Sequence, residues 1–309
     1  MSANVESMFY AGRNTPWHGL GIRVNDALSS EEAIIKSGLD WEVVQQRLYS
    51  EDGAFISGVK ANVRSDTGAV LGIVTDRYKV VQNQEAFNFT DDLLSHGVKY
   101  ETAGSLNNGK RIWLLAKMQE NYTLADEPVE PYMVFTNAHD GNSAVQVAMT
   151  PVRVVCQNTL NLALRNASRK WASNHVGNIH EKLDEARNTL LLADRYMIAL
   201  KHEAERLSMI KLTDKKVLSL IDALVEMPAA PTDLQKSNVI RKREDLWNRY
   251  FGAPDLKVLP KNAWRFINAV SDHVTHSEPL RRTEKYNENL LAKTIDGLPM
   301  VDKALLMVA

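Results

Sequence analysis

The stretch Pro131–Ala167, PYMVFTNAHDGNSAVQVAMTPVRVVCQNTLNLALRNA, decides the fold of this chain. Two runs rich in β-branched and aromatic residues flank the Asp140-Gly141 turn, a pattern that predicts a β-hairpin. A helix is expected to start at Asn158, because Asn is a preferred helix N-cap. The polar residues of the stretch fall at strand ends and turns, where a rigid scaffold presents side chains to ligands.

The same order of features occurs in the first half of the chain. Residues Asp66–Asn83 read as a turn, a strand, a threonine and KVVQN, and residues Asp140–Asn158 read as a turn, a strand, a threonine and RVVCQN. The extra residue of the second run is Cys156. We therefore predict an internal repeat, residues 55–96 and 131–170, of hairpin, strand and helix units that share or pair their sheets.

Capping and turn signals outline the other elements of the first half. The run from Ser29 to Glu32 has capping-box spacing, and Gly38 is placed to end that short helix. Asn107-Asn108-Gly109 predicts a tight turn that needs positive φ. The predicted strands cover residues 41–49, 55–64, 70–75, 78–82, 98–106 and 110–118, and a helix capped by Asn83 interrupts them.

Helix formers dominate the chain after Lys170. Apolar residues recur at alternating spacings of three and four from Leu183 to Leu207, which predicts one continuous helical seam. This seam packs either on another helix of the chain or on a second subunit. We predict an α+β fold of duplicated units that form an antiparallel-rich sheet core in residues 1–172, followed by a helical region in residues 173–309.

Composition limits the classes of function. The chain has 309 residues and a net charge of -1, so no global basic field attracts nucleic acid, although a local basic groove remains possible. One cysteine excludes an internal disulfide, which is typical of a reducing compartment. The N-terminal residues and the rest of the chain lack a long apolar run. We expect a cytoplasmic protein without a targeting signal.

Motifs of common enzymes and metal sites are missing from the sequence. It contains no GxxxxGK[ST] loop, no GxGxxG, no HExxH and no cysteine pair, so we expect no cofactor, no metal and no catalytic residues. His273 with His276, and His175 with His180, have the nearest approach to ligand spacing, but we interpret them as surface residues. A thiolate pair of Cys156 with His139 or His18 is disfavoured, because the first repeat unit lacks the cysteine.

A polar cluster at the hairpin turn is one candidate ligand site. Asp140-Gly141 alone is sufficient to form a hairpin turn, so these two residues need no functional explanation. The flanking polar residues Asn137 and His139 are not needed for the turn. The helix start at Asn158 would offer backbone amides to a phosphate or carboxylate. The alternative is that these residues only maintain turns, caps and core packing. The candidate ligand site comprises Trp17, His18, Asn137, His139, Asp140, Asn158 and Thr159.

Basic residues interleaved with aromatic residues in the predicted strands are a second candidate site. Strand alternation places Arg111 and Trp113 on the same face. Cations and rings on one surface hold single-stranded nucleic acid by contacting phosphates and stacking on bases. Ordinary solvated strand faces would show the same composition. The candidate nucleic-acid-binding residues are Lys60, Arg64, Arg77, Tyr78, Lys79, Lys110, Arg111, Trp113 and Arg153.

Several motifs together resemble a known family. These are WHGLG from Trp17, RYKVVQNQEAF from Arg77, YETAGSL from Tyr100, GKRIWLLAK from Gly109, TNAHDG from Thr136, PVRVVCQNTL from Pro151 and NAWRFINAVSDHV from Asn262. The chain resembles the phage- and plasmid-borne family of uncharacterised proteins from about Trp17 to Val274. This resemblance implies a mobile-element protein expressed in a bacterial cytoplasm, and it carries over no activity.

A second resemblance concerns the order of elements. A short helix, a strand, a hairpin and a helix are similar to the core of single-strand annealing recombinases, which assemble into rings or filaments without nucleotide hydrolysis. The leading hypothesis is a non-enzymatic phage protein that binds single-stranded DNA and promotes annealing or recombination as a homo-oligomer. The alternatives are a small-ligand or nucleotide-binding protein, with enzymatic or counter-defence activity, and a scaffold without a ligand.

Overall fold

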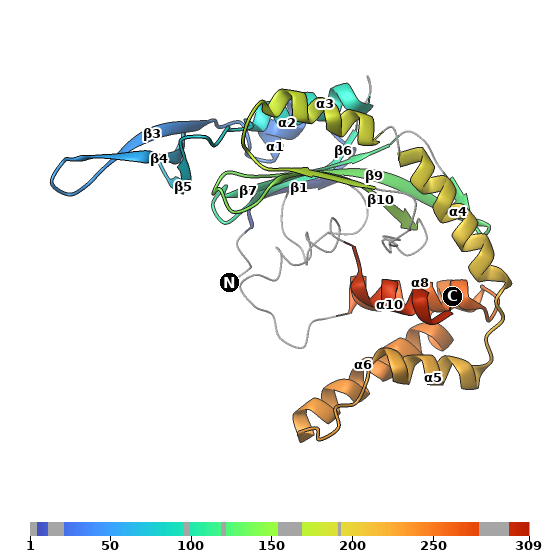
Figure 1. Ribbon diagram of the computed structural model, residues 1–309. Coiled ribbons are helices and arrows are strands. Elements are labelled where there is room, and N and C mark those ends of the chain that lie inside the picture. Colours follow the sequence, from blue (N-terminus) through green and yellow to red (C-terminus); the bar gives the residue numbers. More distant parts are fainter. Residues whose placement is uncertain are drawn as a thin grey trace.

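The structure is a computed structural model that describes residues 5–11, 22–94, 99–118, 122–153, 169–190, 193–277 and 297–308. The described residues have the predicted α+β organisation, with antiparallel-rich sheets in the N-terminal part and helices in the C-terminal part (Figure 1).

The described strands form a large sheet of eight strands and a separate sheet of three. In the large sheet the order is β11-β10-β9-β7-β6-β1-β2, and β8 pairs with β9. β1 and β2 run parallel, whereas the other described pairs of this sheet run antiparallel. Its strands are β1 (Val5–Ala11), β2 (Ile22–Val24), β6 (Lys99–Leu106), β7 (Arg111–Lys117), β8 (Tyr122–Leu124), β9 (Glu127–Ala138), β10 (Val145–Arg153) and β11 (Lys170–Ser173).

Three helices cover one face of the large sheet: α1 (Ser30–Lys36), α2 (Asn83–Leu94) and α3 (Ile179–Leu190) (Figure 1). α1 begins with the predicted capping box at Ser29 and is followed by Gly38 at φ 65°. Phe87 of α2 and Leu183 of α3 share a core with Leu114 and Phe135 of the sheet. Because side chains alternate along a strand, the residues next to Leu114 and Phe135 face the opposite side.

The small sheet, which we call the arm, consists of β3 (Val43–Tyr49), β4 (Phe55–Arg64) and β5 (Val70–Thr75) in that order. The arm projects beyond one end of the large sheet (Figure 1). At its base, the side-chain amide of Gln82 pairs with Val43 as a strand residue would: Oε1 accepts from Val43 N at 2.8 Å, and Nε2 donates to Val43 O at 3.0 Å.

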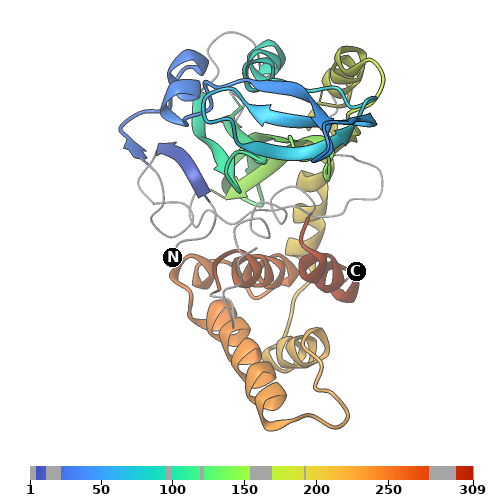
Figure 2. The same ribbon diagram turned by 90° about the vertical axis from the view of Figure 1, so that its left-hand side faces the viewer.

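The helical region has its own core. It contains α4 (Ala193–Met209), α5 (Asp214–Leu224), α6 (Asp233–Gly252), α7 (Pro254–Lys257), α8 (Ala263–His276) and α10 (Pro299–Val308). α4 leads from the sheet layer to the other helices (Figures 1 and 2). Leu200 and Trp264 pack there with Leu124 and Met149 of the sheet, and Trp264 Nε1 donates to Glu127 Oε2 at 3.1 Å. Thr213 caps α5, because its hydroxyl accepts from Lys216 N at 3.2 Å.

Most of the predicted strands and turns of the first half are confirmed, including the Asn107-Asn108-Gly109 reversal, where φ is 54°, 59° and 88°. The predicted strand over residues 78–82 is wrong, because this segment is a loop tied to neighbouring elements by its own polar groups. Asn83 starts a helix but does not cap it. Its amide nitrogen instead donates to the carbonyl oxygens of Leu39 and Trp41, at 3.0 and 3.1 Å.

The helical seam and the internal repeat both differ from expectation. Leu183 of α3 packs in the core between the large sheet and its covering helices, whereas Leu207 of α4 lies in the helical core. The apolar seam is therefore divided between two cores. The hairpins of the two repeat units belong to different sheets. Lys79 lies in a loop, whereas Arg153 ends a strand. The second unit's helix, from Asn158, lies outside the described residues.

Candidate functional site

The base of the arm rests on the turn after β9. A Cβ added to Gly72 would lie 2.6 Å from both Cα and O of Asp140, so only glycine permits this backbone approach. Asn62 of β4 donates from Nδ2 to His139 O at 2.7 Å. The TNAHDG motif is therefore the seat on which the arm is mounted.

A buried polar network surrounds His139. Its Nε2 lies 3.0 Å from Oδ1 of Asn83. Because Asn83 Nδ2 donates to two backbone carbonyls, Oδ1 is the acceptor and His139 Nε2 carries the proton. Burial lowers the pKa of His139 to about 3, so the imidazole is neutral at pH 7. Its Nδ1 is buried and has no hydrogen-bond partner among the described residues.

Tyr78 and His175 close the same region. The Tyr78 hydroxyl donates to Ala138 O at 2.6 Å, and the Tyr78 ring stacks on His175 with centroids 4.4 Å apart. His175 Nδ1 lies 2.9 Å from Lys79 O. Burial lowers the pKa of His175. The stacking role predicted for Tyr78 on a base is wrong, because its side chain is buried and its ring already lies against His175.

The remaining residues of the predicted ligand site divide into two groups. Asn137 is fully buried and donates from Nδ2 to Val81 O at 2.8 Å. Asp140 is half-buried, and its carboxylate accepts from the backbone and side chain of Asn142 at 2.9 and 3.1 Å, which closes the turn. The other predicted members, together with Cys156, lie outside the described residues: Trp17, His18, Asn158 and Thr159.

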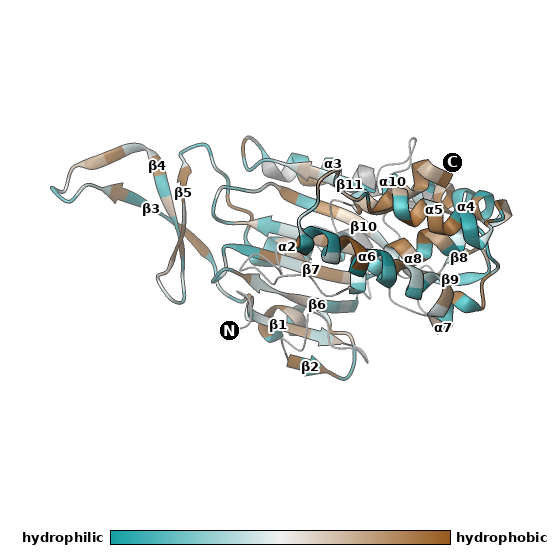
Figure 3. Cartoon of the chain, turned by 90° about the horizontal axis from the view of Figure 1, so that it is seen from below, coloured by the Kyte–Doolittle hydropathy of each residue, from teal (hydrophilic) through white to brown (hydrophobic). Residues whose placement is uncertain are grey.

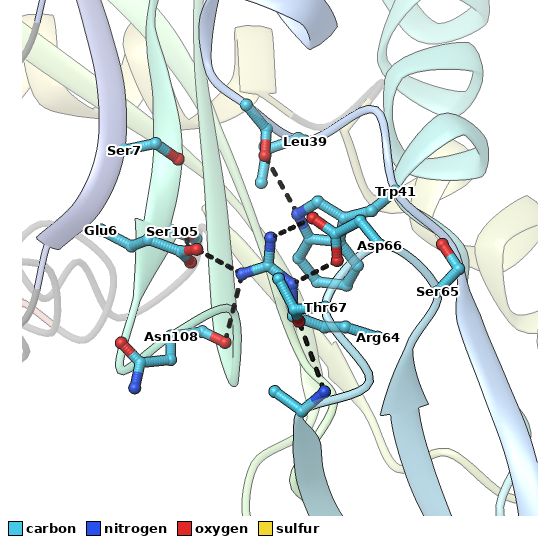
Figure 4. A network of polar contacts seen from close by, with 12 residues as sticks. Glu6, Ser7, Leu39, Trp41, Arg64, Ser65, Asp66, Thr67, Ser105 and Asn108 are labelled. Carbon is cyan, nitrogen blue, oxygen red and sulfur yellow. Dashed lines mark hydrogen bonds and ion pairs between the residues drawn. The ribbon is translucent and has the colours of Figure 1, made fainter.

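Arg64 anchors the arm to the large sheet. Its side chain is 5% exposed, forms ion pairs with Glu6 at 2.5 Å and Asp66 at 2.7 Å, and lies 4.4 Å above the Trp41 ring (Figure 4). Its Nη1 also lies 3.4 Å from Asn108 O in the β6–β7 turn. The predicted phosphate contact is therefore wrong for Arg64, because its charge is neutralised inside the protein.

Trp113 and Arg111 do project from the same face of the large sheet, as predicted. However, Trp113 is 1% exposed and packs with Met8 and Val134, so the prediction that it stacks on a base is wrong. Arg111 is half-buried, and its Nε is buried without a hydrogen-bond partner within the described part of the chain. Arg153 pairs with Val129 through the backbone.

Four predicted cations reach solvent, one on the arm itself and three on loops at its base. Lys60 is 35% exposed and lies 4.0 Å from Asp76, while the others are exposed at the surface. Tyr78 OH contacts Ala138, and His139 N donates to the carbonyl of residue 110 at 2.8 Å, so the loops carrying these cations adjoin the end of β9. The exposed members of this group are Arg77, Lys79 and Lys110.

The sequence interpretation missed an aromatic pair at the tip of the arm. Tyr49 and Phe55 are each 56% exposed, and their ring centroids are 6.0 Å apart. The Arg47 guanidinium lies 5.9 Å from the Phe55 centroid, and Arg47 is opposite Lys60 in the β3–β4 register. Arg47 and Tyr49 are two residues apart on β3 and share a face. Their cross-strand partners, Lys60 and Phe55, lie on that face too, because the β3–β4 register shifts between these two pairs. The signal available in the sequence was the R-x-Y spacing in β3.

A second buried network lies in the helical region. Asp245 Oδ2 is 2.5 Å from His273 Nδ1 and 2.6 Å from Ser277 Oγ, and Arg249 Nε donates to the same oxygen at 2.8 Å. Ser277 Oγ also lies 3.1 Å from His273 Nδ1, so the hydroxyl and the carboxylate contact the same ring nitrogen. The imidazole therefore cannot relay a proton between them as in a nucleophile triad. His273 is 9% exposed, which corrects its predicted surface position. The network ties α6 to α8.

Neither a membrane span nor an acidic metal cluster is found in the described ranges. No described helix combines the length and the apolar character needed to cross a bilayer. Among the described residues, no group of three or more His, Cys, Asp or Glu side chains is placed to hold a metal ion.

Comparison with known proteins identifies a family. The model of a domain of unknown function, DUF932, matches residues 70–295, which includes β5, the seat of the arm and most of the helical region. No curated protein and no solved structure matches the chain. The chain therefore belongs to the DUF932 family of domains of unknown function.

Proposed function

We propose that this protein binds single-stranded DNA through the arm and promotes annealing or recombination as a homo-oligomer, without hydrolysing nucleotides. The observation that carries the proposal is the tip of the arm, where two exposed rings and two cations lie on one face: Arg47, Tyr49, Phe55 and Lys60.

The chemistry of these side chains suits a flexible single strand. Tyr49 and Phe55 are large rings that remain more than half exposed in the folded protein. Exposed rings stack on bases of any sequence, and neighbouring cations meet the phosphates between them. Three further exposed cations at the base of the arm would extend the DNA-binding surface from the tip towards the body of the protein: Arg77, Lys79 and Lys110. The acidic side chains of Glu51 and Asp52 in the tip turn would repel phosphates and so limit the surface at the tip.

The opposite face of the arm supports the self-association part of the proposal. Val44, Val70 and Ile73 are 43%, 58% and 62% exposed. Strand pairing places Val44 opposite Val63, Val63 opposite Val70, and Ile73 opposite Ala61, so these side chains share one apolar face. Figure 3 shows hydrophobic stretches on the strands of the arm. Contiguous exposed apolar surface is typical of protein interaction sites.

The resemblance to phage- and plasmid-borne proteins supports a bacterial, cytoplasmic setting and a role in mobile-element DNA metabolism.

Binding is tested with a fluorescently labelled oligothymidine by anisotropy at low salt. Each ring removed, as Tyr49→Ala or Phe55→Ala, is expected to cost about 1–3 kcal/mol, which is about a 5- to 150-fold rise in Kd. Arg47→Gln and Lys60→Gln are each expected to reduce the slope of log K against log salt by about 0.7.

The matched controls are exposed cations of the helical region, Lys215→Gln and Lys236→Gln, which should leave Kd and the salt slope unchanged. Absence of binding at low salt, or equal losses in arm and control variants, would refute the proposal. Mixing complementary strands with the protein then tests annealing separately, and sedimentation velocity tests self-association.

A further inference from the structure

Three buried acceptor atoms near the end of β9 have no hydrogen-bond partner among the described residues, and they belong to a site separate from the proposed DNA-binding face. The first is His139 Nδ1. Since Asn83 fixes the proton on Nε2, Nδ1 presents a lone pair inside the protein. Within the described residues, no hydrogen-bond donor meets it.

The second and third acceptors are fixed in the same way. His175 Nδ1 lies 2.9 Å from Lys79 O, a pure acceptor, so Nδ1 carries the proton and Nε2 carries the lone pair. Asn137 donates from Nδ2 to Val81 O, which leaves its Oδ1 as an acceptor. Both His175 Nε2 and Asn137 Oδ1 are buried and unpaired among the described residues.

One segment, residues 79–83, bonds all three side chains: Lys79 O accepts from His175, Val81 O accepts from Asn137, and Asn83 Oδ1 accepts from His139. Asn137 lies in β9 and His139 directly follows it, with His139 N still donating to the carbonyl of residue 110 as a strand residue would, so the two side chains project from the same face. His175 stacks on Tyr78, whose hydroxyl is bonded to the carbonyl of Ala138 between them.

We propose that His139 Nδ1, His175 Nε2 and Asn137 Oδ1 bind a first-row transition-metal ion such as Zn²⁺ or Ni²⁺. All three atoms are acceptors, so a protein donor is missing and a cation supplies what the cluster lacks. Neutral imidazole nitrogens are the commonest ligands of such ions.

The surroundings of the two rings match metal-ligating histidines. In metal sites the second ring nitrogen usually donates to a carbonyl or carboxylate, which fixes the tautomer and the ring orientation. Here Lys79 O and Asn83 Oδ1 fill that role. Two nitrogens and an amide oxygen leave further coordination positions for water or an added ligand.

The test uses the full-length chain, stripped with chelator and titrated with Zn²⁺ and with Ni²⁺ by isothermal calorimetry. The expected stoichiometry is one ion per chain. His139→Ala and His175→Ala should each weaken binding about tenfold or more, as loss of a metal ligand or its support does. His202→Ala is the matched control, because the His202 side chain is 74% exposed on α4.

A second readout locates the ion. The Trp41 ring lies 5.5 Å from the His139 ring, so bound Ni²⁺ should quench tryptophan emission in the wild type and quench it less in Trp41→Phe. If His139→Ala does not fold, His175→Ala decides the question. The proposal is overturned if the wild type takes up no metal, so that only internal water satisfies the cluster. It is equally overturned if His175→Ala binds as tightly as the wild type, or if His202→Ala loses as much.

Discussion

Replacing Arg64 by methionine tests whether the arm is held by a buried charge. Arg64→Met removes the guanidinium but keeps an unbranched side chain of similar reach. It breaks the ion pairs with Glu6 and Asp66 and removes the cation above Trp41. Because Arg64 is 5% exposed, methionine would remain largely buried.

The magnitude follows from the exposure of the partners. A hydrogen bond to a charged group contributes about 1.5–3 kcal/mol. The side chains of Glu6 and Asp66 are 31% and 42% exposed, so both rehydrate when the arginine is lost and the lower value, about 1.5 kcal/mol each, applies. Loss of the contact with Trp41 adds about 0.5–1 kcal/mol, and methionine returns about 1 kcal/mol by burial. The free energy of unfolding should therefore fall by about 3 kcal/mol.

Urea unfolding followed by tryptophan fluorescence measures this change. Arg77→Met, at an exposed position, should change the free energy of unfolding by less than about 0.5 kcal/mol. A double-mutant cycle with Glu6→Gln should give a coupling energy of about 1 kcal/mol. A loss below about 1 kcal/mol for Arg64→Met, or one equal to that of Arg77→Met, would refute the conclusion that Arg64 anchors the arm to the large sheet.

Two further perturbations probe the seat of the arm. Since the pKa of His139 is lowered from its ordinary value to about 3, the stabilisation by neutral His139 is complete above about pH 6.5 and is lost as pH falls towards 3. Urea midpoints should fall over this range in the wild type and fall less in His139→Gln; parallel pH profiles would contradict the reasoning. Gly72→Ala places a methyl group 2.6 Å from the backbone of Asp140 and should cost at least about 1–3 kcal/mol. Gly252→Ala, where a Cβ meets nothing within 4 Å, should be neutral or stabilising, and equal thermal shifts for the two variants would show that the contact is unimportant.

Local signals in the sequence were sufficient for much of the fold. The capping box at Ser29 and the Asn107-Asn108-Gly109 turn act through hydrogen bonds and φ angles of neighbouring residues, so the prediction needs no tertiary information. The same is true of the arm hairpins, whose turns carry glycines at positive φ such as Gly68.

The candidate site was less predictable because burial depends on distant segments. Alternation correctly placed Arg111 and Trp113 on one face but did not reveal what packs against Trp113. Arg64 resembles a surface cation in sequence, and only the approach of Glu6 from β1 makes it a buried anchor. Asn83 has a cap residue's identity, yet long-range carbonyls compete successfully for its amide.

The Gln82 side chain at the start of β3 bears on how neighbouring molecules meet the arm. By mimicking a strand residue against Val43, it occupies the margin of the small sheet nearest the body of the protein. An incoming polypeptide that extends this sheet would have to begin further out or displace the amide. The Gln82 amide thus restricts β-augmentation to the distal half of the arm. Because part of the sheet edge is already paired, open-ended polymerisation through this edge is disfavoured.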